Sequence, residues 1–356
     1  MKKTPSLQPH RLLLALSSLL VLTGPVSELR AETVKAAREI FGGITLPSKS
    51  NAQAVGFYAK GCLSGAVAIP TDGKTWQAMR LSRNRRWGHP DMIALLERLS
   101  RDAAAKDGWP GLLLGDISQP RGGPMLNGHS SHQVGLDADI WLIPMPDKTL
   151  TRSERENQPF TSMIRPDKFL TVDERRWTPA HARLLMRAAR YPQVERIFVN
   201  PAIKKKLCDT WQGDRAGMGK IRPYYGHDSH FHIRIKCPEG SSNCKAQEAV
   251  PPGDGCDKSL AWWFTTEPWA KPGPDKEKKP VKKPRLATLA DLPDACRAVV
   301  AAASPASEQE VTFGGTAATA FQSETATPAS IGAVIDAQAG DIPLETIPVP
   351  LARPLD

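Results

Sequence analysis

The sequence predicts an α+β fold of about 240 ordered residues, in which a small sheet is flanked by helices and long loops and stapled by disulfides. Three observations predict it. Apolar residues recur at helical spacing in two well-marked segments. Short apolar runs bounded by glycine or proline are separated by polar loops, which is typical of short strands. Six cysteines, an even number, favour three disulfides in an exported chain.

The first 31 residues have the pattern of a secretory signal peptide. Lys2, Lys3 and Arg11 precede an apolar run over 12–22, and cleavage is expected near Ala31. The apolar run is shorter than the roughly 20 residues of a membrane-spanning helix, and no later segment qualifies. We therefore expect an exported protein without a stable membrane span, although an uncleaved signal would leave a membrane anchor.

The next elements follow from periodicity and from the residues that begin and end helices. A helix is expected over 32–41, and short strands and loops are expected over 44–90. Pro90 begins an amphipathic helix that ends at Gly108. The apolar run Leu112–Leu114, bounded by glycines, predicts a buried strand.

The second half of the compact part contains further helices and strands. The polar stretch over 144–177 is expected to be a surface excursion beside the functional site. A Thr-Pro pair at 178–179 and an Asn-Pro pair at 200–201 each combine a cap with proline at the first helical position. Residues 197–199 and 230–236 have the pattern of strands.

The composition divides the mature chain into four parts. One compact domain is expected over 32–270. Residues 271–285 are nearly all Lys, Pro, Asp, Glu and Gly, which is typical of a linker. A short helical segment over 286–300 contains Cys296 and is expected to be tethered to the body. Residues 301–356 are rich in Ala, Thr, Ser, Pro and Gly and predict a disordered tail.

The net charge of +10 does not indicate a nucleic-acid-binding protein. Four positive charges lie in the presumed signal, and another group lies in the Lys- and Pro-rich run over 276–285. The remaining surplus, such as residues 83–86, suits a solvated face or an acidic polymer outside the cytoplasm. Zinc bound by cysteine thiolates is also disfavoured, because the chain has no Cys-x-x-Cys pair and the compartment is oxidising. The sequence leaves the cysteine pairing and the oligomeric state open.

The stretch GHSSHQVGLDADIWL over 128–142 carries much of the chemistry. His132 and Asp139 are separated by six residues, with Gly135 between them to allow a sharp turn before an alternating, strand-like run. That geometry could return a carboxylate to an imidazole. A catalytic zinc site needs three protein ligands and keeps one position open for water, so a third ligand must come from elsewhere.

The stretch GHDSHFHIRI over 226–235 supplies this ligand. Side chains two residues apart share a face of a strand, so His230 and His232 point together while the apolar residues between and after them point to the core. The predicted zinc ligands are therefore His132, Asp139 and His232.

The other histidines of these two stretches are expected to support the metal site. His230 is the candidate catalytic residue that takes the proton of a water or stabilises an oxyanion. His129 is either a fourth metal ligand or a group that supports a ligand and binds substrate. His227, the second candidate catalytic residue, and Asp228 are expected to orient ring nitrogens of the ligands from outside.

Three histidines lie outside these stretches. His10 belongs to the presumed signal, and His181 is expected on the surface of a helix. His89 has two interpretations, a hydrogen-bonded turn residue or a contact with substrate.

Taken together, these residues resemble a known family. The pattern His-x6-Asp followed by His-x-His is similar to the lysostaphin, D-Ala-D-Ala peptidase and Hedgehog-type metallopeptidases. More narrowly, five ordered blocks over roughly residues 40–270 resemble the penicillin-insensitive murein endopeptidase family, with Cys296 as an outlying match. The blocks are SRNRRWGHP (82–90), GHSSHQVGLDADIWL (128–142), RIFVNPAIKKKLC (196–208), HDSHFHIRIKCP (227–238) and GDGC (253–256).

The resemblance implies a four-stranded antiparallel sheet that carries a zinc at the positions of His132, Asp139 and His232. It implies cleavage of D-alanyl-meso-diaminopimelyl cross-links in periplasmic peptidoglycan. It also implies the disulfides Cys62–Cys296, Cys208–Cys256 and Cys237–Cys244.

The chain departs from the wider group in two places. Ser229 stands where carboxypeptidase relatives have an acidic residue, so the base role falls to His230. Some murein endopeptidases have a second metal position in the loop after the first motif, but 144–177 contains no histidine, and a single zinc is predicted.

Three other functions compete with this interpretation. Ser-x-x-Lys at 242–245 is found in penicillin-binding serine enzymes, but Lys-Thr-Gly is absent and penicillin labelling would decide. A non-catalytic zinc module that binds cell wall would show no activity. A zinc D,D-carboxypeptidase or dipeptidase would differ from an endopeptidase in its products.

Overall fold

The computed structural model describes Met1, residues 35–270 and residues 285–314. The expected signal peptide beyond Met1, the linker up to residue 284 and residues 315–356 lie outside the described residues. Within them, no helix is long and apolar enough to cross a membrane.

The described residues form seven α-helices and eleven strands. The helices are α1 (Ala37–Gly42), α2 (Pro90–Lys106), α3 (Arg152–Asn157), α4 (Pro179–Arg190), α5 (Pro201–Thr210), α6 (Lys258–Trp262) and α7 (Ala295–Ala301). The strands are β1 (Gln53–Phe57), β2 (Lys60–Ser64), β3 (Val67–Ala68), β4 (Asp72–Gly73), β5 (Trp76–Ala78), β6 (Trp87–Gly88), β7 (Leu112–Leu114), β8 (Asp137–Trp141), β9 (Val194–Val199), β10 (Ile221–Pro223) and β11 (His230–Ile235). The α+β class is confirmed, and the helices predicted to begin at the three proline signals begin there.

The central element is a seven-stranded mixed sheet with strand order β10-β9-β11-β8-β7-β5-β4. Within the run β9-β11-β8-β7 each strand is antiparallel to its neighbours, whereas β10 pairs with β9 and β5 pairs with β7 in parallel. The expected four-stranded antiparallel sheet is therefore the centre of a larger mixed sheet. Of the outer strands, β4 and β5 lie within 44–90, where short strands were expected, whereas the sequence did not reveal β10, which is only three residues long and too short to show alternation.

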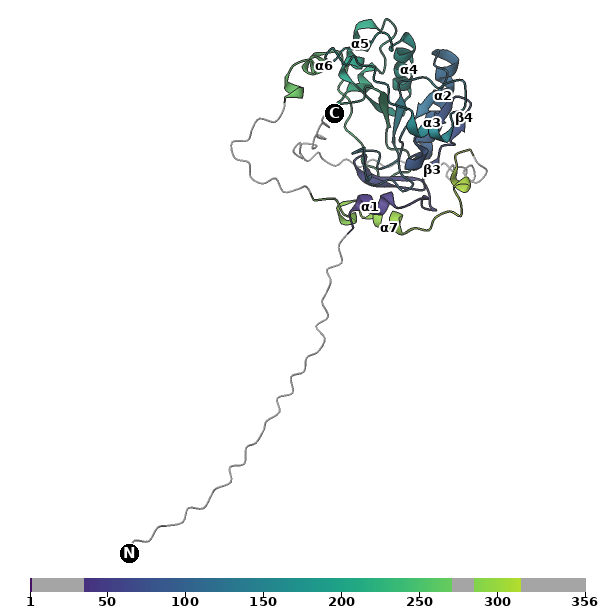
Figure 1. Cartoon of the computed structure of the whole chain (residues 1–356), viewed down its shortest axis with the longest axis vertical. Helices are drawn as coiled ribbons and strands as arrows, with labels where there is room; N and C mark the ends of the chain where they lie inside the picture. Colours follow the sequence, from purple (N-terminus) through teal and green to yellow (C-terminus); the bar gives the residue numbers. More distant parts are fainter. Residues whose placement is uncertain (2–34, 271–284, 315–356) are drawn as a thin grey trace, which may run out of the picture. The chain divides into compact units, whose positions relative to one another are not determined.

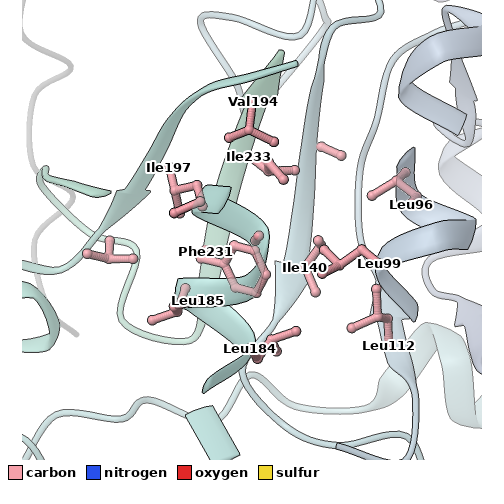
Figure 2. Close-up of a cluster of buried hydrophobic side chains, with 14 of the residues drawn as sticks. Leu96, Leu99, Leu112, Ile140, Leu184, Leu185, Val194, Ile197, Phe231 and Ile233 are labelled. Atoms are coloured by element: carbon pink, nitrogen blue, oxygen red, sulfur yellow. The ribbon is translucent and has the colours of Figure 1, made fainter. Parts of the chain in front are cut away.

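One face of this sheet is apolar and packs against α2 and α4, which lie side by side (Figure 1). Ile140 of β8 and Phe231 and Ile233 of β11 are fully buried in one cluster with Leu96 of α2 and Leu184 of α4 (Figure 2). Because side chains alternate along a strand, the residues between these apolar ones point to the opposite face. The packing of the core thereby fixes which side chains form the functional face.

A second, smaller cluster joins the β1–β2 hairpin to α1 and α7, which lie next to each other in Figure 1. The disulfide Cys62–Cys296 ties this hairpin to α7. The other disulfides are Cys208–Cys256 and Cys237–Cys244, so all three expected pairings are confirmed.

The segment over 301–314 corrects the expected boundary of the tail. The backbone N–H of Phe313 donates to the carbonyl of Ala68 at 2.8 Å, and Arg121 donates to Ser304 at 3.0 Å. Glu308 also forms an ion pair with Arg86. These interactions join residues far apart in the sequence, so local composition could not predict them. The expectation of disorder now concerns only residues outside the described part of the chain.

Two histidines outside the two histidine-rich stretches form hydrogen bonds at the starts of helices. The side chain of His89 caps α2, accepting from the backbone N–H of Asp91 at 3.3 Å. His181 was expected on the surface but is buried. Its Nδ1 accepts from the backbone N–H of Thr178 at 3.1 Å, and its Nε2–H donates to the carbonyl of Leu142 at 3.0 Å. The surface prediction for His181 was wrong because a polar residue in the first turn of a helix gives no local sign that another segment of the chain covers it.

Candidate metal centre

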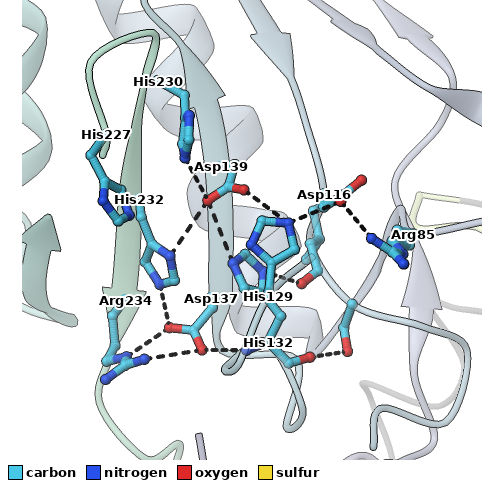
Figure 3. A network of polar contacts seen from close by, with 12 residues as sticks. Arg85, Asp116, His129, His132, Asp137, Asp139, His227, His230, His232 and Arg234 are labelled. Atoms are coloured by element: carbon cyan, nitrogen blue, oxygen red, sulfur yellow. Dashed lines mark hydrogen bonds and ion pairs between the residues drawn. The ribbon is translucent and has the colours of Figure 1, made fainter. Parts of the chain in front are cut away.

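The polar face of β8 and β11 brings the two histidine-rich stretches together (Figure 3). His232 lies opposite Asp139 in the antiparallel register. His230 is placed on the same face by strand alternation, as predicted, and so are Asp137 and Arg234.

The loop before β8 holds His132 in an unusual backbone conformation. His132 has φ of 67°, in the left-handed region that non-glycine residues seldom occupy. Its backbone N–H donates to the carboxylate of Asp137 at 3.0 Å. Gly135 has φ of 70°, and a side chain there would meet the backbone nitrogen of His89 at 2.9 Å. The tight turn expected at this glycine is therefore required for the loop to pack.

Three ring nitrogens surround one oxygen of Asp139. Its Oδ1 lies 3.5 Å from Nε2 of His132, 3.4 Å from Nδ1 of His232 and 3.8 Å from Nε2 of His230. In a tetrahedral zinc site with bonds of about 2.0–2.1 Å, ligand atoms lie about 3.3–3.4 Å apart. The separations to His132 and His232 match this spacing, and the separation to His230 is longer.

Two of these atoms have no hydrogen-bond partner within the described residues. Nε2 of His132 and Oδ1 of Asp139 are both buried and unpartnered. A buried polar atom without a hydrogen-bond partner lowers the stability of the fold by about 1–3 kcal/mol. A bound ligand that contacts both atoms would remove this cost. An imidazole lone pair and a carboxylate oxygen suit a divalent metal. The candidate donor atoms of His129, His132 and Asp139 all lie within 4.8 Å of one another.

Outer hydrogen bonds fix which nitrogen of each ring faces the centre. Nε2–H of His232 donates to Asp137 at 2.8 Å, and Nδ1–H of His132 donates to the carbonyl of Ile117 at 2.6 Å. Asp137 also accepts from Nε of Arg234 at 2.7 Å. Asp137 and Arg234 were not among the site residues predicted from the sequence. Alternation along each strand could have found them, because each lies two residues from a predicted ligand on the same face.

The electrostatics favour the deprotonated forms of His232 and Asp139. Burial lowers the pKa of His232 to about 4, so the imidazole is neutral near pH 7. Burial alone would raise the pKa of Asp139, but the surrounding histidines outweigh it and hold that pKa well below its usual range. Burial would also raise the pKa of Asp137, but Arg234 and His232 lower it. For His132, burial lowers the pKa, but Asp139 reverses the effect and the net shift is upward.

His129 contacts two carboxylates. Its Nε2 lies 3.0 Å from Asp116 and 3.4 Å from Asp139. Asp116 also accepts from Arg85 at 2.9 Å and from Arg83 at 3.0 Å. Burial would raise the pKa of Asp116, but His129 and the two arginines lower it to about 2. These contacts place His129 beside the candidate centre, and its role as a fourth ligand or as a supporting group stays a prediction. Asp116 was not among the predicted site residues either, because no local pattern marks it.

His227 lies beside His230, with ring centroids 5.0 Å apart. Nδ1–H of His227 donates to the carbonyl of Tyr225 at 2.7 Å, and burial lowers its pKa to about 3. The partners that orient the rings of His132 and His232 are Ile117 and Asp137, so His227 and Asp228 do not have the orienting role expected for them. The side chain of His230 is 24% exposed, which leaves it open to solvent next to the buried centre.

The surroundings of the Ser-x-x-Lys match do not resemble a serine-enzyme active site. Ser242 and Lys245 are exposed, and Ser242 lies within the loop closed by Cys237–Cys244. The backbone N–H of Lys245 donates to the carbonyl of Gly56, and no helix begins at Ser242.

Imidazole and carboxylate donors that converge on the polar face of an α+β sheet, with a solvent-open histidine beside them, define this protein as a metallopeptidase-type hydrolase. Comparison with known proteins is more specific. The chain belongs to the penicillin-insensitive murein endopeptidase family, whose model matches residues 54–301.

The aligned region covers most of the length of each of three named relatives. The penicillin-insensitive murein endopeptidase of Haemophilus influenzae is 48% identical over 242 residues, which are 67% of this chain and 82% of the relative. The Yersinia enterocolitica protein of the same name is 41% identical over 236 residues, 65% of this chain and 83% of the relative. One from Klebsiella pneumoniae is 40% identical over 257 residues, 72% and 89% of the two chains.

Proposed function

We propose that this protein is a zinc-dependent endopeptidase that hydrolyses D-alanyl-meso-diaminopimelyl cross-links of peptidoglycan in the periplasm. Membership of the family supports the reaction class. Three disulfides support an oxidising compartment outside the cytoplasm. The single observation that carries the metal assignment is the buried, unpartnered pair of His132 Nε2 and Asp139 Oδ1, with Nδ1 of His232 at matching distance.

His132, Asp139 and His232 would hold the metal. Two nitrogens and one oxygen are a donor set that zinc accepts, and three protein ligands are the number that a catalytic zinc site uses. When bound, zinc polarises the scissile carbonyl and lowers the pKa of a water molecule. Asp137 keeps the ring of His232 in the tautomer whose Nδ1 faces the centre.

His230 is proposed to move the proton. Its Nε2 is 3.8 Å from Oδ1 of Asp139, next to the candidate metal centre. Because the side chain is partly exposed, a bound substrate can reach it. An imidazole in this place can take a proton from the attacking water and deliver it to the leaving amine. His227 stays neutral and uses its Nδ1–H on Tyr225, so its Nε2 is left as an acceptor for His230 or for an N–H of the substrate.

The test uses the purified protein and defined muropeptides. We expect one zinc per chain, conversion of cross-linked dimers to monomers, loss of this activity in chelator and no effect of penicillin. Asp139→Asn serves as the matched control and should lack both metal and activity. Full activity of confirmed metal-free protein would refute the metal assignment. Release of free D-alanine from monomeric pentapeptides, without cleavage of dimers, would identify a carboxypeptidase instead.

A further inference from the structure

Arg80 lies over a tryptophan of the strand that carries the candidate metal centre. The guanidinium carbon of Arg80 is 5.4 Å from the ring centroid of Trp141 and 5.3 Å from that of Phe160. Trp141 follows Asp139 by two residues on the same face of β8 and pairs in register with His230. The cation therefore lies at one end of the functional face.

Close packing puts Trp141 and Asp139 side by side. A side chain at Gly115 would meet Nε1 of Trp141 at 3.0 Å and the β-carbon of Asp139 at 3.3 Å. Trp141 is 2% exposed, and Arg80 and Phe160 help to cover it. Phe160 itself is 53% exposed, so the cation lies near solvent at the rim of the site.

The charge of Arg80 has no carboxylate partner among the described residues. The guanidinium makes one hydrogen bond, from Nη2 to the carbonyl of Gln158 at 2.6 Å, and its Nε is buried without a partner. Burial and the neighbouring Arg83 lower the pKa of Arg80 and outweigh the opposing effects of Glu156 and Asp116, neither of which forms an ion pair with it. A guanidinium offers donors in a planar fork that matches a carboxylate.

The backbone holds Arg80 in place before any ligand binds. Its φ of 53° is in the left-handed region, which a non-glycine residue occupies only where the surroundings impose it. Its backbone N–H donates to the carbonyl of Arg155 at 3.3 Å. The side chain of Arg155 is buried and donates to the carbonyls of Leu150 and Ala78 at 2.9 and 3.0 Å. Side chains positioned in this way bind with a smaller loss of conformational entropy.

We propose that Arg80 binds a free carboxylate of the murein peptide and thereby selects the substrates of the enzyme. This inference rests on the proposed function. In a cross-linked peptide, meso-diaminopimelate keeps a free carboxyl group on the carbon that bears the scissile amide nitrogen. Two residues of a strand span about 6.8 Å, so Trp141, over which Arg80 lies, is about that far along β8 from Asp139.

The experiment compares matched substrates on Arg80→Gln. The substrates are a cross-linked muropeptide with all carboxylates free, one with the diaminopimelate carboxylate amidated, and one with the stem glutamate carboxylate amidated. We expect the wild type to lose about 10- to 100-fold in kcat/KM when the recognised carboxylate is amidated, the scale of a hydrogen bond to a charged group. Arg80→Gln should lose the same factor on the free substrate and nothing further on the amide. Arg80→Lys should recover part of the preference.

A matched control separates recognition from folding. Arg98 also lies over an aromatic ring, 4.5 Å from the centroid of Tyr191, but it belongs to α2 on the other side of the sheet. Arg98→Gln should keep the wild-type preference, and the zinc content and thermal midpoint of Arg80→Gln should stay near wild type.

Each result decides the assignment. A wild type indifferent to amidation at both positions overturns it, and so does an Arg80→Gln protein that is equally slowed on every substrate. Loss only with the glutamate amide would support carboxylate binding and assign it to that residue. If the wild type cleaves no cross-linked substrate, the proposed function itself fails, and the carboxylate assignment fails with it.

Discussion

The carboxylate of Asp137 accepts a 2.8 Å hydrogen bond from Nε2–H of His232. The same carboxylate accepts a 3.0 Å hydrogen bond from the backbone N–H of His132. One fully buried side chain therefore sets the tautomer of one proposed ligand and the left-handed backbone of another. Arg234 neutralises it, which allows a carboxylate to remain ionised in the interior.

Asp137→Asn should weaken zinc binding by about 10- to 100-fold, because the amide is a poorer acceptor for both partners. It should also lower the free energy of unfolding by about 3 kcal/mol, since Arg234 would remain buried without a carboxylate. Zinc titration against a competing chelator and denaturant unfolding measure the two effects. Asp116→Asn is the control, because the side chain of Asp116 contacts His129 but none of His132, Asp139 and His232, and the substitution leaves its backbone hydrogen bond with Asp139 in place. Equal zinc affinity in Asp137→Asn and wild type would contradict the positioning role.

His230→Ala and His232→Ala should separate catalyst from ligand. We expect His230→Ala to keep stoichiometric zinc and near-native stability while losing about 100-fold or more in turnover, the scale of acid–base assistance. His232→Ala should lose the metal, because Nδ1 of His232 lies at ligand distance from Asp139. Zinc content and turnover of cross-linked muropeptides are measured on both variants. A metal-free His230→Ala protein would show that the two roles are exchanged.

The C-terminal segment should tolerate truncation at one point and not at another. A chain ending at Gly314 should keep full activity and the wild-type thermal midpoint. A chain ending before Cys296 loses the disulfide to Cys62, which closes a loop of 234 residues and contributes about 5.5 kcal/mol by chain entropy. Ending at residue 301 should have an intermediate effect, because the contacts of Ser304, Glu308 and Phe313 are removed. Equal midpoints for chains ending at 301 and 314 would contradict the packing of this segment.

His181 should make the fold sensitive to acid. Burial lowers its pKa in the folded protein below the ordinary value of 6.5, so below pH 6.5 the unfolded chain binds more protons than the folded one. The free energy of unfolding should therefore be highest above pH 6.5 and decrease as the pH falls from 6.5 toward the lowered pKa. His181→Gln should be less stable at pH 7.5 by about 1–2 kcal/mol, from lost hydrogen bonds, but should decline less steeply on acidification.

This comparison is made on metal-free protein with its disulfides intact, so that metal release does not contribute. Urea unfolding between pH 7.5 and 5 gives both curves. If the free energy of unfolding falls equally with pH in the wild type and in His181→Gln, the burial of His181 does not contribute to the acid sensitivity of the fold.

The sequence by itself determined the elements whose signals are local. Proline after a capping residue predicted where α2, α4 and α5 begin, and alternation in β11 predicted that His230 and His232 share a face. These predictions succeed because backbone sterics and side-chain periodicity act over a few residues. The motif spacing was sufficient for the family resemblance, and through it for the disulfide pairing.

Only the tertiary structure decided which groups surround the centre and what they contact. Local alternation places Asp137 and Arg234 on the functional face, but their contacts, like those of Asp116, follow from strand register and from loops that meet across the sheet. Arg80 meets Trp141 from a segment 61 positions earlier in the chain. His181 and residues 301–314 likewise became buried or paired through contacts between distant segments. Such contacts depend on the closure of long loops around a shared core, and no local pattern of residues encodes them.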